Sequence, residues 1–281
     1  MSTIFTMPGK TGDSVLQFPV IHHWHKQTGE KCEIWMDEKT CKPLVNLFAA
    51  QPAVESVKLV EGVENYNCGG QPFHMNLPTS AYSGNNIYHL GFRAFPIRQI
   101  SLQTLNDAKV PVTVDPETFA NEPYLTVGEV VKVNRLVLHG QGICPHNRQT
   151  PTFWRFLASI RDEVNDTYDE VTFVGSPDDL EVAKETYPDW NTYSDDGDFL
   201  VLARFIAASR AMIGCGSSPI TIAGALKVPA VRVHDMIGND APRVIWDNGG
   251  ENQLNDTHVG LRTSYPEWRD RFILGVSTGK A

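Results

Sequence analysis

Short apolar runs alternate with amphipathic segments through the first third of the chain. Apolar residues three or four positions apart predict helices, and the short β-rich runs between them predict strands. The expected elements are, in order, a strand over Thr3–Met7, a turn over Gly9–Asp13, a helix over Ser14–Gln27, a strand over Lys31–Met36, a helix over Lys42–Ala50 and a strand over Ser56–Val60. Because strands joined by helices pair in parallel, this third predicts a parallel sheet.

The same alternation returns after a less regular region, Glu64–Tyr124, which has apolar islands at Ile87–Phe95 and Val110–Val114. The elements expected beyond it are strands over Lys132–Leu138, Glu170–Val174, Ala211–Ile213 and Ala230–Val233, and helices over Thr152–Val164, Asp178–Tyr187, Phe199–Ser209 and Ile220–Leu226. The predicted fold class is therefore α/β, with two Rossmann-like α/β/α domains, residues 1–130 and 131–281, facing each other across a cleft.

Composition narrows the classes of protein that this chain can belong to. Of its 281 residues, 41% are hydrophobic and 20% are charged, which is enough apolar material for two cores. The formal net charge of −9 argues against a strong electrostatic hold on a polyanion. The five cysteines form no C-x-x-C pair, and no apolar run is long enough to span a membrane. These features predict a cytoplasmic protein with reduced thiols.

The loops that follow strands are where open α/β domains bind ligands. The most informative of them is Gly214–Ser218, a run of small residues followed by Pro219 at the start of an apolar helix. Small residues let the backbone approach a ligand closely, and the helix start offers free N–H groups and the positive end of the helix dipole. The turn therefore predicts a phosphate site.

Two further loops carry candidate chemistry. Gly12 and Asp13 stand at the start of the first predicted helix, where an aspartate is either an N-cap or an ionised carboxylate base. Arg148 is the lone cation before the helix that follows the strand end at His139 and Gly140. It is either a solvated surface residue or a phosphate ligand, and the histidine is either structural or a polar contact.

A metal site is not expected. His22 and His25 share a helical face in the run HHWH, but no carboxylate or fourth ligand stands at a useful spacing. The acidic turn Asp195–Asp198 is better explained as a solvated loop than as a magnesium or ribose contact.

Four segments, taken in order, form a recognisable series. They are GKTGDSVLQFP with Gly12, Asp13 and Pro19, then LHGQG with NRQTPTFW, then VTFVGSPDDLEVAKE, and last GCGSSPITIAGALKVP. This series resembles the ADP-heptose–lipopolysaccharide heptosyltransferases of glycosyltransferase family 9, which have the GT-B fold. The resemblance covers Ser2–Gly62 and, more closely, Arg135–Val233, and the chain is a short and divergent example.

The resemblance implies a metal-independent, inverting glycosyltransferase, hexosyl- or heptosyltransferase-like, that moves a sugar from a nucleotide-diphosphate sugar to an acceptor hydroxyl. It makes Asp13 the catalytic base. The residues that it implies for nucleotide-sugar binding are Gly12, His139, Gly140, Arg148, Gly175, Gly216, Ser217, Ser218 and Thr221. No cofactor is expected besides the donor substrate, and the acceptor is a carbohydrate or another hydroxyl compound.

Three other functions stay open. A sugar-nucleotide epimerase or hydrolase of the same fold needs the same phosphate site. A non-catalytic nucleotide-sugar-binding protein is suggested by Gly216 and Thr221, which stand where the family has an aspartate and a histidine. A nucleic-acid acceptor is disfavoured by the net charge of −9 but kept open by a small basic face at Arg93, Arg98 and Lys109.

Overall fold

The computed structural model describes residues 3–7, 10–61, 87–89, 122–140, 150–215, 217–234 and 243–247. Several features of the sequence analysis lie outside these residues. They are the apolar island Val110–Val114, the basic face within Arg93–Lys109, and the candidate ligands Arg148 and Gly216.

The first half of the chain forms a small parallel sheet with helices. Its elements are β1 (Thr3–Met7), α1 (Thr11–Thr28), β2 (Cys32–Asp37), α2 (Glu38–Cys41), the 3₁₀ turn η1 (Lys42–Leu44), α3 (Val45–Ala49), β3 (Val54–Val60) and β4 (Ile87–His89). The strand order is β3-β2-β1-β4, and every pair is parallel. The predicted parallel sheet is therefore confirmed.

Helix α1 forms because its apolar residues recur at helical spacing. Val15, Phe18 and Ile21 are all buried, and the ring of Phe18 stacks on that of Phe48 in α3 with their centroids 4.9 Å apart. Gly29 ends the helix with a φ of 71°, and its N–H donates to the carbonyl of His25 at 2.8 Å. This left-handed conformation favours glycine, which has no Cβ to clash.

The second half forms a larger sheet. Its elements are β5 (Arg135–His139), α6 (Thr150–Ser159), α7 (Arg161–Thr167), β6 (Glu170–Val174), α8 (Pro177–Thr186), β7 (Asn191–Tyr193), α9 (Phe199–Ala208), β8 (Ala211–Gly214), α10 (Ser218–Ala225), β9 (Ala230–His234) and β10 (Arg243–Asp247). The strand order is β10-β9-β8-β5-β6-β7. All neighbours are parallel except β10, which pairs antiparallel with β9.

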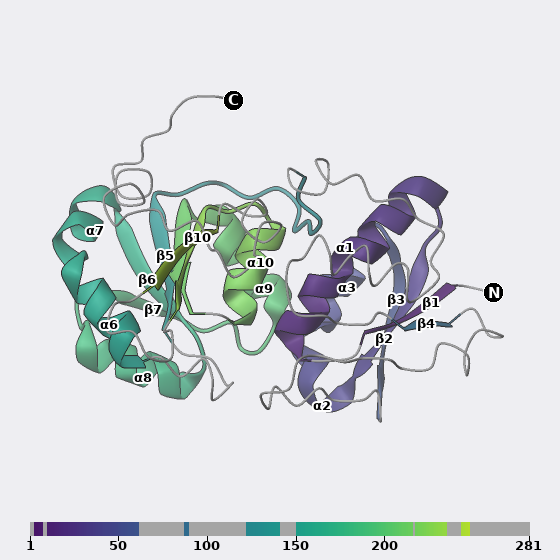
Figure 1. Ribbon diagram of the computed structural model, residues 1–281, viewed down its shortest axis with the longest axis horizontal. Helices are drawn as coiled ribbons and strands as arrows, with labels where there is room; N and C mark the ends of the chain where they lie inside the picture. The colour runs from purple at the N-terminus through teal and green to yellow at the C-terminus, as the bar shows by residue number, and fades with distance from the viewer. Residues whose placement is uncertain are drawn as a thin grey trace.

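The two sheets are joined through a double layer of helices. Figure 1 shows α1 and α3 beside the smaller sheet and α9 and α10 beside the larger one, with α6, α7 and α8 on the far face of the larger sheet. Helix α1 packs on α10, and α3 packs on α9. One buried apolar cluster includes Phe48 of α3, Leu202 of α9 and Ile220 of α10, together with residues of both sheets. The described parts of the halves thus meet through a packed interface, and a cleft between two domains stays a prediction.

The described segment that connects the halves, residues 122–134, is hydrogen-bonded to α10 and to α9. The N–H of Tyr124 donates to the carbonyl of Ala225 in α10 at 3.1 Å, and the N–H of Val133 donates to the carbonyl of Ala208 in α9 at 2.8 Å. The predicted boundary after residue 130 falls within this segment.

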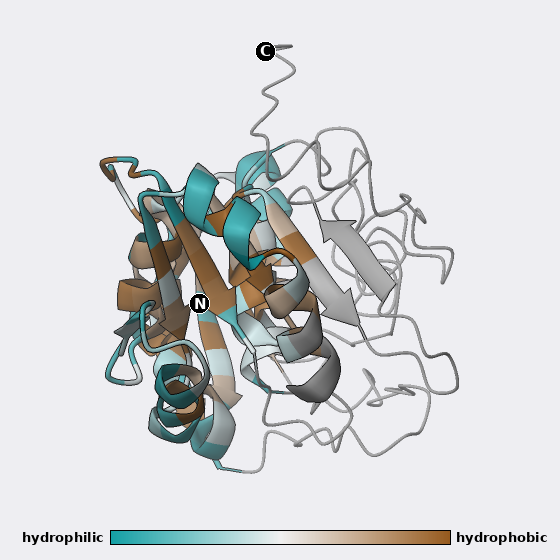
Figure 2. Cartoon of the chain, turned by 90° about the vertical axis from the view of Figure 1, so that its left-hand side faces the viewer, coloured by the Kyte–Doolittle hydropathy of each residue, from teal (hydrophilic) through white to brown (hydrophobic). Residues whose placement is uncertain are grey.

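Polarity separates the inside of the second half from its outside. Figure 2 shows strands that are mostly hydrophobic behind outer helices that carry hydrophilic residues. Leu136, Val137 and Leu138 of β5 are fully buried, as expected for a central parallel strand that is covered on both faces. Among the described residues, no helix combines the length and the apolar character that crossing a bilayer requires.

Several elements differ from the sequence prediction; β10 and α2 were not predicted, and the helix predicted over Lys42–Ala50 is η1 followed by α3. Helix α1 already begins at Thr11, so the predicted turn over Gly9–Asp13 is too long. The single helix predicted over Thr152–Val164 is two helices, because Ile160 leaves helical geometry with φ −120° and ψ 8°. The short strand β7 was not predicted, since three residues are too few to show an apolar alternation.

Candidate functional site

In each sheet, the described strands that come first in the sequence extend to one side, and the later strands extend to the other side. In the smaller sheet the switch point from one side to the other lies between β1 and β4, and in the larger sheet it lies between β5 and β8. Ligands of open α/β sheets bind beside the carboxyl ends of strands at such points, because the loops on either side of them diverge and leave a crevice. Helix α1 follows β1 and helix α10 follows β8, so both helices begin at a switch point.

The start of α10 leaves polar groups available. Ser217 is the N-cap residue, but no side chain caps the helix and its first turn holds no acidic residue. The hydroxyl of Ser217 instead donates back to the carbonyl of Cys215 at 3.3 Å. Among the described residues, the N–H of Thr221 donates to the carbonyl of Ser217 at 3.2 Å. The backbone N–H groups in the first turn of a helix are the donors that bind an anion at a helix start.

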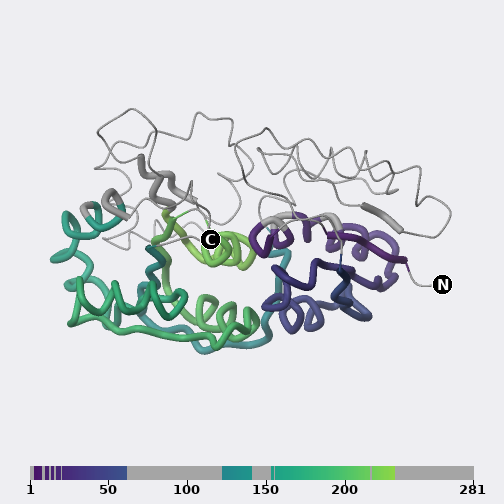
Figure 3. The backbone as a smooth tube through the Cα atoms, turned by 90° about the horizontal axis from the view of Figure 1, so that it is seen from below, coloured from purple at the N-terminus to yellow at the C-terminus, as the bar shows by residue number. Residues whose placement is uncertain are grey.

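The starts of α1 and α10 touch. Figure 3 shows the first turn of α1 against α10 at the middle of the molecule. The hydroxyls of Thr11 and Ser218 are hydrogen-bonded with their oxygens 2.5 Å apart, although 207 residues separate them in the chain. A Cβ on Gly12 would lie 3.5 Å from the Ser218 hydroxyl oxygen and 3.6 Å from its backbone nitrogen. A side chain at position 12 would therefore contact Ser218, and the backbone of Asp13 is one residue further along α1.

The carboxyl ends of β5 and β8 are bound to each other by buried hydrogen bonds. The N–H of Cys215 donates to the carbonyl of His139 at 3.0 Å, and its thiol donates to the carbonyl of Gly140 at 3.3 Å. The imidazole Nδ1 of His139 lies 2.9 Å from the carbonyl oxygen of Val174 at the end of β6. His139 is buried, so this residue ties three strand ends together beneath the switch point.

Burial governs the acid–base state of the thiol at this position. It raises the pKa of Cys215 to about 12, and the nearby Asp179 carboxyl adds to the increase. A buried thiol loses the hydration that would stabilise a thiolate. Cys215 is therefore a neutral packing residue rather than a nucleophile.

Two predicted site residues stand in turns that are already hydrogen-bonded. A Cβ on Gly175 would lie 2.9 Å from the Asp179 Cβ, so only glycine fits there. Ser176 and Asp179 form a reciprocal cap at the start of α8. Thr221 is buried in α10, and its hydroxyl donates to the carbonyl of Ser217 at 3.0 Å. This bond holds the turn that carries Ser217.

The acidic turn before α9 is a capping structure. Asp198 is the N-cap, and its carboxylate accepts from the N–H of Leu200 at 2.8 Å and from the Asn46 amide of α3 at 2.7 Å. Asp195 accepts from the N–H of Gly197 at 2.9 Å. These bonds agree with the prediction of a loop at Asp195–Asp198.

The described histidines of α1 make different contacts and do not converge on one point. Burial, with His23 and Lys26 nearby, lowers the pKa of His22 to about 4, and Nδ1 of His25 lies 2.6 Å from the Glu30 carbonyl oxygen. In the part of the chain that the structure describes, no three histidine, cysteine or acidic side chains are grouped as a metal site requires.

Comparisons with known proteins give a result at the level of structure only. No protein-family model matches the sequence, and no curated protein sequence matches it. The chain is similar to solved structures, including the following three. The E. coli heptosyltransferase WaaC with ADP is 14% identical with a TM-score of 0.53, over 83% of this chain and 86% of that one. A glycosyl transferase family 9 protein from Veillonella parvula is 14% identical with a TM-score of 0.52, over 82% and 79%. The E. coli ADP-heptose lps heptosyltransferase II is 12% identical with a TM-score of 0.51, over 83% and 84%.

The chain has the fold of the family 9 heptosyltransferases. The resemblance that four short segments indicated is thereby confirmed for the fold, and so is the α/β class with parallel sheets. In this heptosyltransferase fold, the described site residues divide into two groups. Gly12 and Ser218 meet at the helix starts. His139 and Gly140 lie with Cys215 at the strand ends below them.

Sequence analysis missed two residues of this heptosyltransferase fold that contribute to the site. Thr11 makes a hydrogen bond between the starts of α1 and α10, and Cys215 joins β5 to β8. A threonine directly before the Gly-Asp pair is the only local signal for the first. The second needed the strand order, which no local pattern contains.

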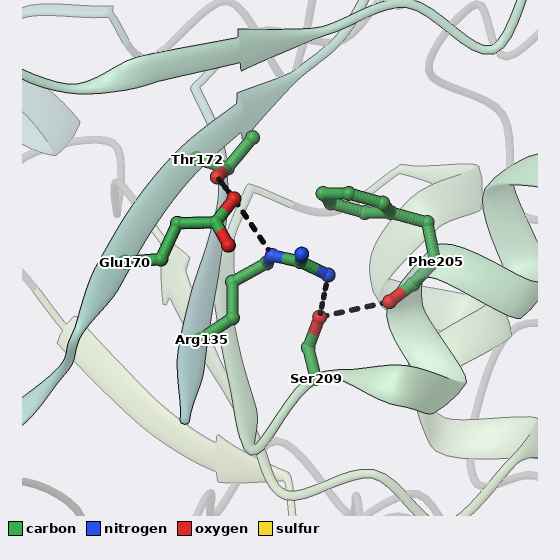
Figure 4. A network of polar contacts seen from close by, with 5 residues as sticks. All are labelled: Arg135, Glu170, Thr172, Phe205 and Ser209. Atoms are coloured by element: carbon green, nitrogen blue, oxygen red, sulfur yellow. Dashed lines mark hydrogen bonds and ion pairs between the residues drawn. The ribbon is translucent and has the colours of Figure 1, made fainter. Parts of the chain in front are cut away.

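A polar network with a structural role lies at the amino ends of the inner strands β5 and β6. Figure 4 shows Arg135 between Glu170, Ser209 and Phe205. Nε of Arg135 lies 2.9 Å from Oε1 of Glu170, and its guanidinium carbon lies 4.1 Å from the centre of the Phe205 ring. The hydrogen bond from Arg135 holds the pKa of Glu170 below its usual value. This network fixes the amino ends of β5 and β6, away from the switch point.

Proposed function

We propose that the chain is a glycosyltransferase that moves a sugar from a nucleotide-diphosphate sugar to an acceptor hydroxyl, inverting the anomeric centre without a metal. The observation that carries this proposal is the contact between the starts of α1 and α10, within the heptosyltransferase fold. It brings the turn that bears Asp13 next to the turn that bears Ser218.

The donor diphosphate binds at the start of α10. The backbone donors there, the Ser218 hydroxyl and the positive end of the helix dipole all favour an anion. Arg148, which follows β5 in the sequence, is the guanidinium proposed to complete this binding. Fixed donors of this kind stabilise the charge that develops on a departing diphosphate, which is the role that a metal ion has in other enzymes. Addition of EDTA should therefore leave turnover unchanged.

The acceptor hydroxyl binds beside α1, where Asp13 acts as the general base. The carboxylate takes the hydroxyl proton as the oxygen attacks the anomeric carbon and forms the new glycosidic bond. The bond from the anomeric carbon to the diphosphate breaks, and its electron pair leaves with the diphosphate. Attack from the face opposite the leaving group inverts the centre, and general base catalysis contributes about 10²- to 10⁴-fold to the rate.

The remaining candidate ligands have supporting roles. His139, Gly140 and Gly175 shape the strand ends, and Thr221 fixes the turn through its bond to Ser217. Gly216 permits close backbone approach of the diphosphate, since it has no side chain. None of these roles depends on the identity of the sugar.

A donor panel tests the proposal. ADP-, GDP- and UDP-sugars are each screened by thermal shift, then incubated with and without a panel of mono- and disaccharide glycosides as acceptors. A true donor at a hundredfold excess over its Kd adds about 2.7 kcal/mol to the free energy of unfolding. Acceptor-dependent release of nucleoside diphosphate, with an inverted product by NMR, supports the proposal. Acceptor-independent release points to the hydrolase alternative, and a panel without binding contradicts the proposal.

A further inference from the structure

Thr11 joins the first helix of one half to the proposed phosphate-binding turn of the other through a hydrogen bond. Its hydroxyl oxygen lies 2.5 Å from that of Ser218, in a part-buried bond between the first turns of α1 and α10. Thr11 stands two residues before Asp13, and a Cβ added to Gly12 between them would be at contact distance from Ser218. The contact is thus made by the same helical turn that carries the proposed base.

The two helices that meet at this bond are fixed along their length. Val15 and Phe18 anchor α1 in the apolar cluster, and Ile220, Ile222 and Ala225 anchor α10 in it. A packed core resists small displacements, because each one costs many contacts at once. The bond between Thr11 and Ser218 therefore aligns two rigid bodies at their ends rather than tethering two loops.

The Thr11 and Ser218 hydroxyls can make a further hydrogen bond. Each hydroxyl has one proton and two lone pairs, and the mutual bond uses one of the two protons. The second proton remains for a third partner, and a diphosphate oxygen at the start of α10 is such a partner. Thr11 reaches this anion through Ser218, whereas the backbone donors of α10 do not depend on it.

We infer that Thr11 is a positioning residue for the transfer reaction, which sets the separation between the base on α1 and the donor diphosphate on α10. This inference rests on the proposed function. Loss of the Thr11 hydroxyl leaves donor binding nearly intact, because the donors of α10 remain. It lowers the rate of the chemical step, because misplacement of reacting groups by about 1 Å costs on the order of 10²-fold.

The test uses the full chain and the donor and acceptor that give turnover in the panel. Thr11→Val removes the hydroxyl at constant shape, and Thr11→Ser keeps it. The expected result for Thr11→Val is a kcat that is about 10- to 100-fold lower, with the donor KM and the Kd for the nucleoside diphosphate within about twofold of wild type. Thr11→Ser should restore kcat. Thr28→Val, at the far end of the same helix, is the matched control and should keep kcat.

A double-mutant cycle with Ser218→Ala separates positioning from other roles. If Thr11 acts through Ser218, adding Thr11→Val to Ser218→Ala causes no further loss of kcat. Wild-type kcat in Thr11→Val, or tighter donor binding in that variant, would overturn the inference while the proposed function stands. A drop in Tm with unchanged kcat would show a structural role only. A wild-type protein without turnover contradicts the proposed function itself.

Discussion

The side-chain amide of Gln51 pairs with both backbone groups of Thr126. Its Nε2 donates to the Thr126 carbonyl at 2.9 Å, and its Oε1 accepts from the Thr126 N–H at 2.9 Å. Nε2 also donates to the carbonyl of Leu47 in α3 at 2.7 Å. Gln51 is buried, so one side chain ties the connecting segment to the first half.

Removal of this amide should destabilise the whole chain. Gln51→Met keeps the size of the side chain but loses all three hydrogen bonds, so we expect the free energy of unfolding to fall by about 1–3 kcal/mol. Urea denaturation at pH 7 measures it. Gln27→Met, at an exposed position in α1, is the control and should change stability by less than about 0.5 kcal/mol. Equal effects of the two substitutions would contradict the importance of the paired amide.

The ion pair between Arg135 and Glu170 should make stability depend on pH. The pKa of the Glu170 carboxyl is lowered in the folded state, mainly by its bond to Arg135. The carboxylate therefore stabilises the fold above its unfolded pKa, and this contribution is lost as the pH falls through the folded pKa.

Glu170→Gln tests this dependence. At pH 7 the variant should be about 1 kcal/mol less stable than wild type, a modest value because the pair is partly exposed to solvent. The difference should shrink as the pH falls from about 5 to about 2. Glu181→Gln, on the exposed face of α8, should show no such trend. A constant difference across this range would mean that the charge of Glu170 is not what stabilises the pair.

Glycine is required at Gly140 but not at Gly214. A Cβ on Gly140 would lie 2.8 Å from Cε1 of the buried Phe153 ring and 3.2 Å from Cη2 of Trp154. At Gly214, the nearest atoms would be 3.4 to 3.5 Å away, which is ordinary contact. We expect Gly140→Ala to lower the free energy of unfolding by about 1–3 kcal/mol and Gly214→Ala to be tolerated. Thermal and urea unfolding of the two variants measure the difference, and a reversed order would contradict the packing at this strand end.

The thiols of Cys32 and Cys215 should resist alkylation in the folded protein. Burial raises the pKa of each to about 12, so almost no thiolate exists at pH 8. Treatment with iodoacetamide at pH 8, followed by peptide mass spectrometry, should leave both residues unmodified until urea unfolds the chain. Rapid labelling of Cys215 without denaturant would show that the strand ends open to solvent.

The sequence was sufficient for elements with strong local patterns. The strands Thr3–Met7 and Glu170–Val174 have the bounds that were predicted, because their apolar runs are flanked by turn residues. The Pro219 turn correctly predicted a helix start after β8, since proline fits the first turn of a helix. Resemblance to the heptosyltransferases correctly indicated the fold.

The contacts that build the candidate site could not be predicted from the sequence. Thr11 and Ser218 are 207 residues apart, and their meeting depends on how α1 packs on α10. The switch point between β5 and β8 depends on strand order, which local patterns do not encode.

In the proposed mechanism, α1 supplies the carboxylate base that deprotonates the acceptor, and α10 holds the donor. Asp13→Asn tests it most directly, because the amide keeps the shape of the side chain but cannot take the acceptor proton. Single-turnover transfer and donor Kd are measured on the same sample. We expect transfer to fall by about 10²- to 10⁴-fold while donor Kd stays within about twofold of wild type. Wild-type transfer in Asp13→Asn, or loss of donor binding in its place, would contradict it.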